Sequence, residues 1–235
     1  MKDFIKEELS GWKKSEVLWL LLACTIITCL SVYWGDSLIG IISSTTGVAC
    51  VVCTGKGKLS AYVFGLINCV LYAAIAYKAG YYGEVSLNAL YYVPMQFVGF
   101  FTWRKNMNTE THEVNKRHMS NENRVLLLIS IIFGTVIYGY ILKCIGGEMP
   151  FVDAFTTVSS VVAMIISIKM FAEQWWIWIC VNIFSMLLYI VDVINGGDTY
   201  ATILMWLTYL INAVIMVIKW EKEVRHNENS SRITE

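Results

Sequence analysis

Two stretches of the chain decide its fold: Ser60–Lys78, SAYVFGLINCVLYAAIAYK, and Gln174–Asp192, QWWIWICVNIFSMLLYIVD. Each is apolar over about the 17–25 residues that a helix needs to cross a ~30 Å hydrocarbon layer. Each also carries one asparagine near its middle, Asn68 in the first and Asn182 in the second. A buried amide at the same place in two apolar segments indicates an internal duplication within a membrane protein.

The duplication extends well beyond these segments. A shift of 114 positions lays residues 38–105 over residues 152–219 without a gap. The aligned pairs are Tyr62 with Trp176, Phe64 with Trp178, Gly83 with Gly197, Glu84 with Asp198, Tyr92 with Trp206, and Lys105 with Lys219. A unit of three crossings ends on the opposite side of the membrane, so one extra crossing between two units makes them parallel. Parallel repeats are known from transporters whose site lies where the repeats meet, which predicts a small-molecule carrier.

Composition requires the bilayer as solvent. The chain has 235 residues, of which 57% are hydrophobic and only 15% charged, more apolar surface than a soluble domain of this length can bury. The apolar runs are continuous rather than alternating, which favours helices over barrel strands. Eight spans are predicted, at residues 16–34, 37–53, 59–77, 85–103, 125–145, 151–170, 174–194 and 199–219.

Basic residues predict the orientation. Sixteen of the eighteen Lys and Arg residues fall in the termini and loops of one side, and only Lys78 and Lys143 fall on the other. The positive-inside rule therefore places both termini in the cytoplasm, which requires an even number of spans. The formal net charge of zero gives no indication of nucleic-acid binding, and no nucleic-acid partner is expected.

The expected fold class is an all-α polytopic membrane protein with two parallel three-helix repeats joined by one linker helix (3+1+3), plus an extra N-terminal helix. The first span is too long and ends in residues too bulky for a cleaved signal peptide, and it is interpreted as an accessory helix. The tail from Glu221 is polar and expected to be disordered. The predicted divisions are 1–35 (N-terminal tail and accessory helix), 36–105 (first repeat), 106–150 (cytoplasmic loop and linker helix), 151–220 (second repeat) and 221–235 (cytoplasmic tail).

Residue types needed for catalysis or metal binding are missing from the predicted spans. His112, His118 and His226 fall in loop or tail and are expected to be solvated, and Cys50 and Cys53 have no second ligand pair. No phosphate-binding loop, zinc-protease motif or nucleophile elbow occurs, so neither an enzyme nor a metal or other cofactor is expected.

Acidic residues are also scarce inside the spans. Five map to span ends, namely Asp36, Glu84, Asp153, Glu173 and Asp198. Asp192 lies among apolar neighbours, and it either lines an outer vestibule or belongs to the interface. A chain with so few intramembrane acids has little machinery for proton or sodium coupling, which favours passive transport.

The seventh span holds the strongest candidate site. Five side chains recur at helical spacing on one stripe: Trp175, Trp178, Asn182, Ser185 and Tyr189. Indoles above an amide and a hydroxyl suit a flat aromatic ligand, the more so if its ring is cationic. Tryptophan also favours the membrane interface, and Trp176 is assigned to that belt.

The fourth span supplies a second polar stripe. Asn88, Tyr92, Gln96 and Gly99 keep helical spacing, with Tyr91 beside them and Pro94 able to bend the helix. Amides in membrane helices can equally join one helix to another. Asn68 ranks next as a substrate contact, and Tyr209, with Trp206 and Asn212, follows in the eighth span.

The run Tyr91–Asn106, YYVPMQFVGFFTWRKN, resembles the PnuC family of nicotinamide riboside transporters, as do Trp175-x-x-Trp178-x-x-x-Asn182 and Asn88-x-x-Tyr91. The likeness covers about residues 36–220. It implies a bacterial inner-membrane protein with a full-length SWEET-like fold that takes up nicotinamide riboside by facilitated diffusion. A cytoplasmic riboside kinase then traps the substrate. Pro94 is alone in mid-span, unlike the repeated prolines of sugar carriers with this fold, so their hinge is not carried over.

Three alternatives stay open beside this reading. Related subfamilies carry thiamine or riboflavin, which are also flat ring systems, and a non-transporting receptor subunit would share the apolar composition. The internal duplication with paired asparagines speaks against a receptor, and the missing catalytic pairs speak against an intramembrane enzyme. The expected partners are the small-molecule substrate and the lipid bilayer, and a homo-oligomer is compatible with the sequence.

Overall fold

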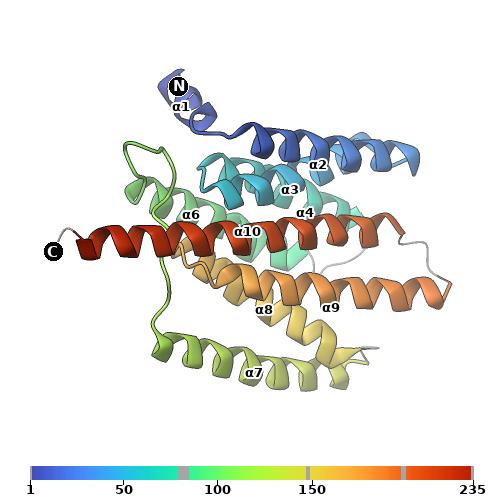
Figure 1. Ribbon diagram of the computed structural model, residues 1–235. Helices are drawn as coiled ribbons and strands as arrows, with labels where there is room; N and C mark the ends of the chain where they lie inside the picture. The colour runs from blue at the N-terminus through green and yellow to red at the C-terminus, as the bar shows by residue number, and fades with distance from the viewer. Residues whose placement is uncertain (1, 79–84, 147–148, 197–199, 234–235) are drawn as a thin grey trace. The chain divides into compact units, whose positions relative to one another are not determined.

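The computed structural model describes residues 2–78, 85–146, 149–196 and 200–233, and these form helices joined by loops (Figure 1). The elements are α1 (Lys2–Leu9), α2 (Lys14–Tyr33), α3 (Leu38–Lys56), α4 (Ser60–Lys78), the π-helix η1 (Leu87–Tyr92), α6 (Val93–Lys105), α7 (Asn121–Cys144), α8 (Pro150–Ile168), α9 (Gln174–Ile194) and α10 (Tyr200–Ile233). The chain divides into two compact units, Met1–Asn115 and Lys116–Glu235. They are called unit 1 and unit 2 below.

Within the described residues, seven helices are long and apolar enough to cross a membrane: α2, α3, α4, α7, α8, α9 and α10. Each coincides with a predicted span. The remaining prediction, residues 85–103, corresponds to η1 and α6, which follow each other directly but are divided by a change of helix type. The protein is therefore an all-α polytopic membrane protein, as expected.

The division of that segment has a local cause at Pro94. Proline has no N–H to donate to the carbonyl four residues earlier, and its ring crowds that carbonyl. The chain widens before the proline into six π-helical residues, Leu87–Tyr92, and the N–H of Val93 donates to the carbonyl of Asn88, five residues back. The sequence predicts a bend here, and the structure has a π turn instead. Such turns are frequent at functional sites.

In unit 1 the helix α2 packs on α3. Two hydroxyl pairs join α2 to α3: Thr28 Oγ1 lies 2.9 Å from Thr45 Oγ1, and Ser31 Oγ lies 3.0 Å from Ser44 Oγ. Such contacts between small polar side chains hold helices together where no water competes. The helix predicted to be accessory is thus attached to unit 1 through α3.

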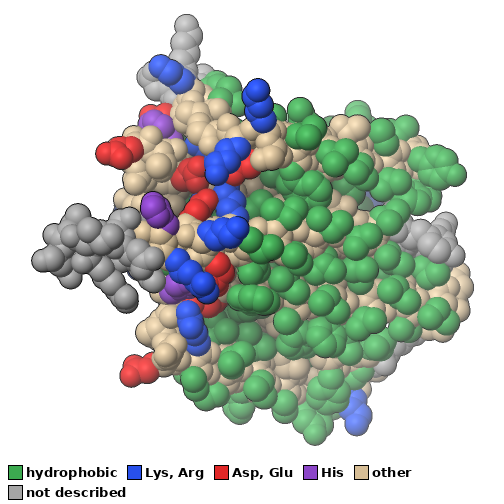
Figure 2. Space-filling model, viewed as in Figure 1, with side chains coloured by type: hydrophobic (Ala, Val, Ile, Leu, Met, Phe, Trp, Pro, Cys, Tyr) green, Lys and Arg blue, Asp and Glu red, His purple; other side chains and the backbone are tan. Residues whose placement is uncertain are grey.

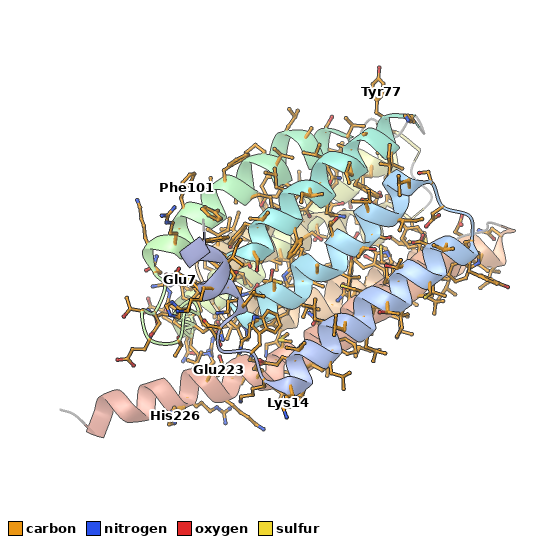
Figure 3. All side chains as sticks on the ribbon, turned by 90° about the horizontal axis from the view of Figure 1, so that it is seen from above. Glu7, Lys14, Tyr77, Phe101, Glu223 and His226 are labelled. Atoms are coloured by element: carbon orange, nitrogen blue, oxygen red, sulfur yellow. The ribbon has the colours of Figure 1, made fainter. Side chains whose placement is uncertain are left out.

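Two buried lysines close one end of unit 1. The ammonium of Lys56 lies 2.7 Å from carboxylate oxygens of both Glu16 and Glu113, and that of Lys58 donates to the carbonyls of Glu7 (2.9 Å) and His112 (2.8 Å). These contacts bind α1, the start of α2 and the loop after α6 to the turn between α3 and α4. Figure 3 shows Glu7 at this end of the unit and Tyr77, near the end of α4, at the other.

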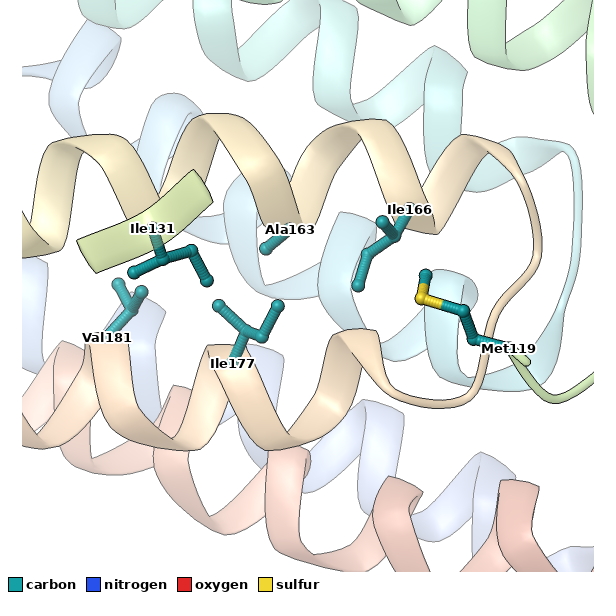
Figure 4. Packing of buried hydrophobic residues seen from close by; sticks show 6 residues of the cluster. All are labelled: Met119, Ile131, Ala163, Ile166, Ile177 and Val181. Atoms are coloured by element: carbon teal, nitrogen blue, oxygen red, sulfur yellow. The ribbon is translucent and has the colours of Figure 1, made fainter. Parts of the chain in front are cut away.

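Unit 2 has its own hydrophobic core between α7, α8 and α9. The buried side chains are Met119, Ile131, Ala163, Ile166, Ile177 and Val181 (Figure 4). Partly buried apolar residues pack against them, including Trp178 of α9 and Trp206 of α10. The core therefore supports the middle of α9, where the candidate site was predicted.

A second ionic cluster closes one end of unit 2. Glu173 accepts from the backbone N–H of Met119 (3.0 Å) and from Arg124 Nε (2.9 Å) and Nη2 (2.6 Å). His118 lies between two carboxylates, 3.4 Å from Glu173 and 3.6 Å from Glu221. The prediction that His118 is a solvated surface residue was wrong, because the loop before α7 folds back onto the ends of α9 and α10.

The region after Glu221 also differs from expectation. It was predicted to be disordered, but α10 continues as a helix to Ile233 (Figure 1). A salt bridge between Lys116 and Glu223 holds the first turn after Glu221, and the Lys116 ammonium also lies 5.4 Å from the centre of the Trp220 ring. Polar sequence alone does not exclude a helix when an apolar helix precedes it and tertiary contacts extend it.

Apolar side chains cover most of the helical surface in Figure 2, and Lys, Arg, Asp and Glu gather towards the helix ends. This is the distribution that a hydrocarbon layer requires, because charged groups at its centre are costly. The aligned pairs Gly83 with Gly197 and Glu84 with Asp198 lie outside the described residues.

Candidate functional site

The predicted stripe on α9 is the face that this helix buries. Trp175, Asn182 and Ser185 are buried, and Trp178 and Tyr189 are half-buried. Trp176, assigned from the sequence to the interfacial belt, is 55% exposed and points away from this face. The helical spacing of the stripe thus separated inward from outward side chains correctly.

Asn182 is the most unusual residue on this face. Its side chain is 3% exposed, and no hydrogen bond joins it to another side chain or carbonyl in the described part of the chain. Burying an amide without a partner costs about 1–3 kcal/mol. An amide that keeps its donor and acceptor open within an apolar span is suited to binding a polar ligand that brings its own partners.

Asn68, which the sequence shift aligns with Asn182, is placed differently. Asn68 Nδ2 donates to the carbonyl oxygen of Ser43 at 2.8 Å and lies 3.3 Å from the Ser43 hydroxyl. The amide of Asn68 therefore joins α4 to α3. The residue type is the same at both positions, but only in unit 1 is the N–H donor of the amide bound by the neighbouring helix.

Three further candidates in unit 2 lie at different levels. Trp175 is about 10 Å along α9 from Asn182, given a rise of 1.5 Å per residue, and its ring meets that of Trp220 edge-on at 5.7 Å. Tyr209 of α10 packs edge-on against Trp206 at 5.8 Å, and both are half-buried. Trp178, packed on the core beside Val181, is the indole nearest to Asn182 in the sequence.

In unit 1 the fourth span interlocks with α4. The buried side of α6 consists of Gln96, Gly99 and Trp103, and α4 faces it with Tyr62 and Gly65. The amide of Gln96 lies over Gly65, where an added Cβ would be 2.5 Å from Oε1. In turn the ring of Tyr62 lies on Gly99, so closely that a Cβ there would overlap its Cε1. Each large side chain thus fills the space left by a glycine on the other helix.

This interlock fixes Gln96 and Tyr62 within the apolar interior. Gln96 is 7% exposed, and its Nε2 donates to Cys69 Sγ at 3.9 Å. The Tyr62 ring stands perpendicular to that of Trp103 with centroids 5.0 Å apart, and its hydroxyl is buried without a hydrogen-bond partner among the described residues. Gln96 was predicted as a substrate contact. Tyr62, Gly65 and Cys69 were not, because their role depends on which residue of α6 they face.

The other candidates of unit 1 belong to the π turn. Asn88, Tyr91 and Tyr92 all lie in η1, with Asn88 buried and the two tyrosines half-buried. The two rings pack edge-on at 5.2 Å. Because a π-helix holds more residues per turn than an α-helix, the regular spacing predicted from Asn88 through Gly99 is not kept across Tyr92.

The structure thus places the ten predicted residues five to a unit. Unit 1 holds Asn68, Asn88, Tyr91, Tyr92 and Gln96, and unit 2 holds Trp175, Trp178, Asn182, Tyr189 and Tyr209. The buried amides of Asn182, Asn88 and Gln96, together with half-buried aromatic rings, offer hydrogen bonds and stacking faces. No group of three or more His, Cys, Asp or Glu side chains arranged for a metal ion occurs among the described residues.

Comparison with known proteins identifies relatives over nearly the whole chain. Residues 37–222 match the model of a family described as nicotinamide mononucleotide transporter. The nicotinamide riboside transporter PnuC of Neisseria mucosa is 39% identical over 227 residues, which cover 94% of this chain and 86% of the relative. The PnuC transporter of Haemophilus influenzae is 34% identical over 222 residues, with 94% and 95% covered.

A solved structure has the same fold. The crystal structure of the vitamin B3 transporter PnuC superimposes with a TM-score of 0.82 at 38% sequence identity, covering 95% of this chain and 98% of that one. The relatives are named as transporters, in agreement with the expectation that the chain is not an enzyme. Identity and coverage of this size, over a shared all-helical membrane fold, mean that the chain belongs to the PnuC family of membrane transporters.

Proposed function

We propose that this protein carries nicotinamide riboside across the inner membrane by facilitated diffusion. One observation supports this most directly: Asn182 presents a buried amide with no partner among the described residues, on the same face of α9 as Trp178. A carboxamide or ribose hydroxyl can satisfy such an amide, and a cationic pyridinium ring is attracted to an indole face.

The residues favour the riboside over the mononucleotide that the family description names. A phosphate dianion needs a cation or a set of N–H donors. The buried lysines of the described chain, Lys56, Lys58 and Lys116, lie at helix ends and are bound to carboxylates or carbonyls. The candidate residues offer amides, hydroxyls and aromatic rings, which match the uncharged ribose and the cationic ring of the riboside.

Transport is proposed to need no ion gradient. The buried charged residues in the described chain are Glu8, Lys56, Lys58 and Lys116, and each has a partner near a helix end. A proton- or sodium-coupled carrier places a titratable or coordinating carboxylate within its spans. Asp192, the acid with the most apolar sequence neighbours, has an exposed side chain.

The mechanism proposed is rocking of two three-helix repeats, arranged 3+1+3, about a mid-membrane site. Each unit is tied internally at one end, unit 1 through Lys56 and Lys58 and unit 2 through Glu173. The loop between the units binds to both of them. The N–H of Val114 donates to the carbonyl of Gly57 in unit 1, and the N–H of Arg117 donates to the carbonyl of Met170 in unit 2. Asn115 also donates to Asn106 of unit 1, and Lys116 pairs with Glu223 of unit 2, so the contacts of the chain change from one unit to the other between adjacent residues, which suits a hinge.

Both termini are proposed to face the cytoplasm, because the two ionic clusters and the excess of basic residues lie at the ends that follow the even-numbered spans. Riboside that enters there is trapped by a cytoplasmic riboside kinase, whose phosphorylated product carries charge that the site does not accommodate. Uptake is then driven by the concentration gradient of the free riboside.

Calorimetric titration of the purified protein tests the substrate. Nicotinamide riboside, nicotinamide mononucleotide, thiamine and riboflavin are compared in the wild type and in Asn182→Leu. Selective binding of the riboside that is lost in the variant supports the proposal. Preference for another of these ligands, or riboside binding that is equal in both proteins, contradicts it.

A further inference from the structure

The amide of Gln96 is held against α4 in one orientation. Its Nε2 donates to Cys69 Sγ at 3.9 Å, within hydrogen-bond range for sulfur, and Cys69 is 6% exposed. Its Oε1 accepts no hydrogen bond from the described residues. One N–H of the amide is therefore bound to sulfur, and the oxygen, which lies over Gly65, has no donor among the described residues.

Gly65 makes this orientation possible. A Cβ at this position would lie 2.5 Å from Gln96 Oε1, 2.9 Å from Cδ and 3.1 Å from Cys50 Sγ. Real Cβ atoms do not approach other atoms as closely as 2.5 Å, so any larger residue displaces the amide. The Gln96 amide thus packs on α4 against Gly65 and the sulfur of Cys69.

The two ends of an amide are chemically distinct, since the NH2 group only donates and the oxygen only accepts. One N–H bound to sulfur fixes the orientation of the Gln96 amide, and its oxygen stays available as an acceptor for a ligand. A carboxamide brings N–H donors to meet it, whereas a carboxylate brings only acceptors, and two facing acceptors repel. A site built to pair with a ligand N–H rejects the analogue that lacks it.

We propose that Cys69 and Gly65 are positioning residues that fix the Gln96 amide with its oxygen open, and that this makes the protein select a carboxamide-bearing ligand over its carboxylate analogue. The inference rests on the proposed function, because it assigns a specificity to the same site. It adds residues of α4 that touch Gln96 rather than the ligand.

The test is a ratio of affinities. Nicotinamide riboside and nicotinic acid riboside are titrated into the wild type and into Cys69→Ala, with Cys53→Ala as a matched control, since Cys53 is also a buried cysteine, 2% exposed, on the neighbouring helix α3. The wild type and Cys53→Ala are expected to prefer the carboxamide by about tenfold or more, the factor that one hydrogen bond worth ~1.4 kcal/mol supplies. In Cys69→Ala the amide is free to turn, and the ratio falls towards one.

A purely structural role for Cys69 would weaken both ligands in the same proportion, so an unchanged ratio in Cys69→Ala overturns the proposal. Gly65→Ala is expected to reduce the ratio as well, because it displaces the same amide. If this variant does not fold, Cys69→Ala still decides the question.

A second measurement does not depend on the substrate. The rate at which a membrane-permeant maleimide modifies Cys69 is followed by mass spectrometry in the full-length wild type and in Gln96→Ala. Removing the amide that covers the sulfur should raise this rate several-fold, with no such rise at Cys53. Equal rates would refute the contact. If neither riboside binds the wild type, the proposed substrate fails, while the labelling result still decides whether Gln96 sits on Cys69.

Discussion

Asn68 and Asn182, which the sequence shift aligns, should respond in opposite ways to the same substitution. Leucine has the branched shape of asparagine but no polar atoms, so Asn68→Leu and Asn182→Leu remove the amides with little change in volume. Asn68 loses two contacts to Ser43, at 2.8 and 3.3 Å. At about 0.5–1.5 kcal/mol for each hydrogen bond, unfolding should become easier by roughly 1–3 kcal/mol. That lowers the melting temperature by about 2–4 °C per kcal/mol in a chain of this size.

Asn182 has no such contact to lose. Its buried amide costs about 1–3 kcal/mol in the ligand-free protein, so Asn182→Leu should leave the melting temperature unchanged or raise it. Ligand affinity should fall by about 5- to 150-fold, the equivalent of losing 1–3 kcal/mol of hydrogen bonding, whereas Asn68→Leu should change it less than about threefold. Both quantities come from thermal melts in detergent with and without nicotinamide riboside. If Asn182→Leu is as destabilised as Asn68→Leu and keeps its affinity, the functional difference between the two asparagines is refuted.

The other predictions concern packing and aromatic contacts. Gly99→Ala should cost about 1–3 kcal/mol of stability by overpacking, visible as a lower melting temperature, and unchanged melting would contradict the interlock of α4 with α6. Trp178→Ala should weaken riboside binding in calorimetry, whereas Trp176→Ala, at the exposed side of α9, should not; equal losses would point to folding rather than a site. Lys58→Met should leave two carbonyls without their donor, so hydrogen exchange in α1 should accelerate while α8 and α9 keep their protection. Unaltered exchange in α1 would mean that Lys58 does not hold it.

Much of the fold was predictable because a membrane span leaves a strong signature. Uninterrupted apolar runs located every long helix, and the periodicity of α9 separated the exposed Trp176 from the buried Asn182. The π turn could not be derived in the same way. A proline predicts an irregular helix, but whether the helix kinks or widens to a π turn depends on the packing of neighbouring helices.

What the sequence did not reveal depends on contacts between distant residues. Nothing near His118 in the sequence indicates that Glu173 and Glu221 flank it, and the helical continuation of α10 depends on Lys116, more than a hundred positions from its partner Glu223. Likewise Gly65 carries no local signal of function. Its importance is apparent only once Gln96 is seen to occupy the space above it.

The most direct test of the account is uptake of radiolabelled nicotinamide riboside into proteoliposomes that contain only this protein. Entry of the riboside should be saturable, should equilibrate without a proton or sodium gradient, and should show counterflow when the vesicles are preloaded with unlabelled riboside. It should be lost in Asn182→Leu but kept in Asn68→Leu. Accumulation above the external concentration that depends on an imposed ion gradient would contradict passive transport. Absence of riboside entry in folded wild-type protein would contradict the proposed function itself.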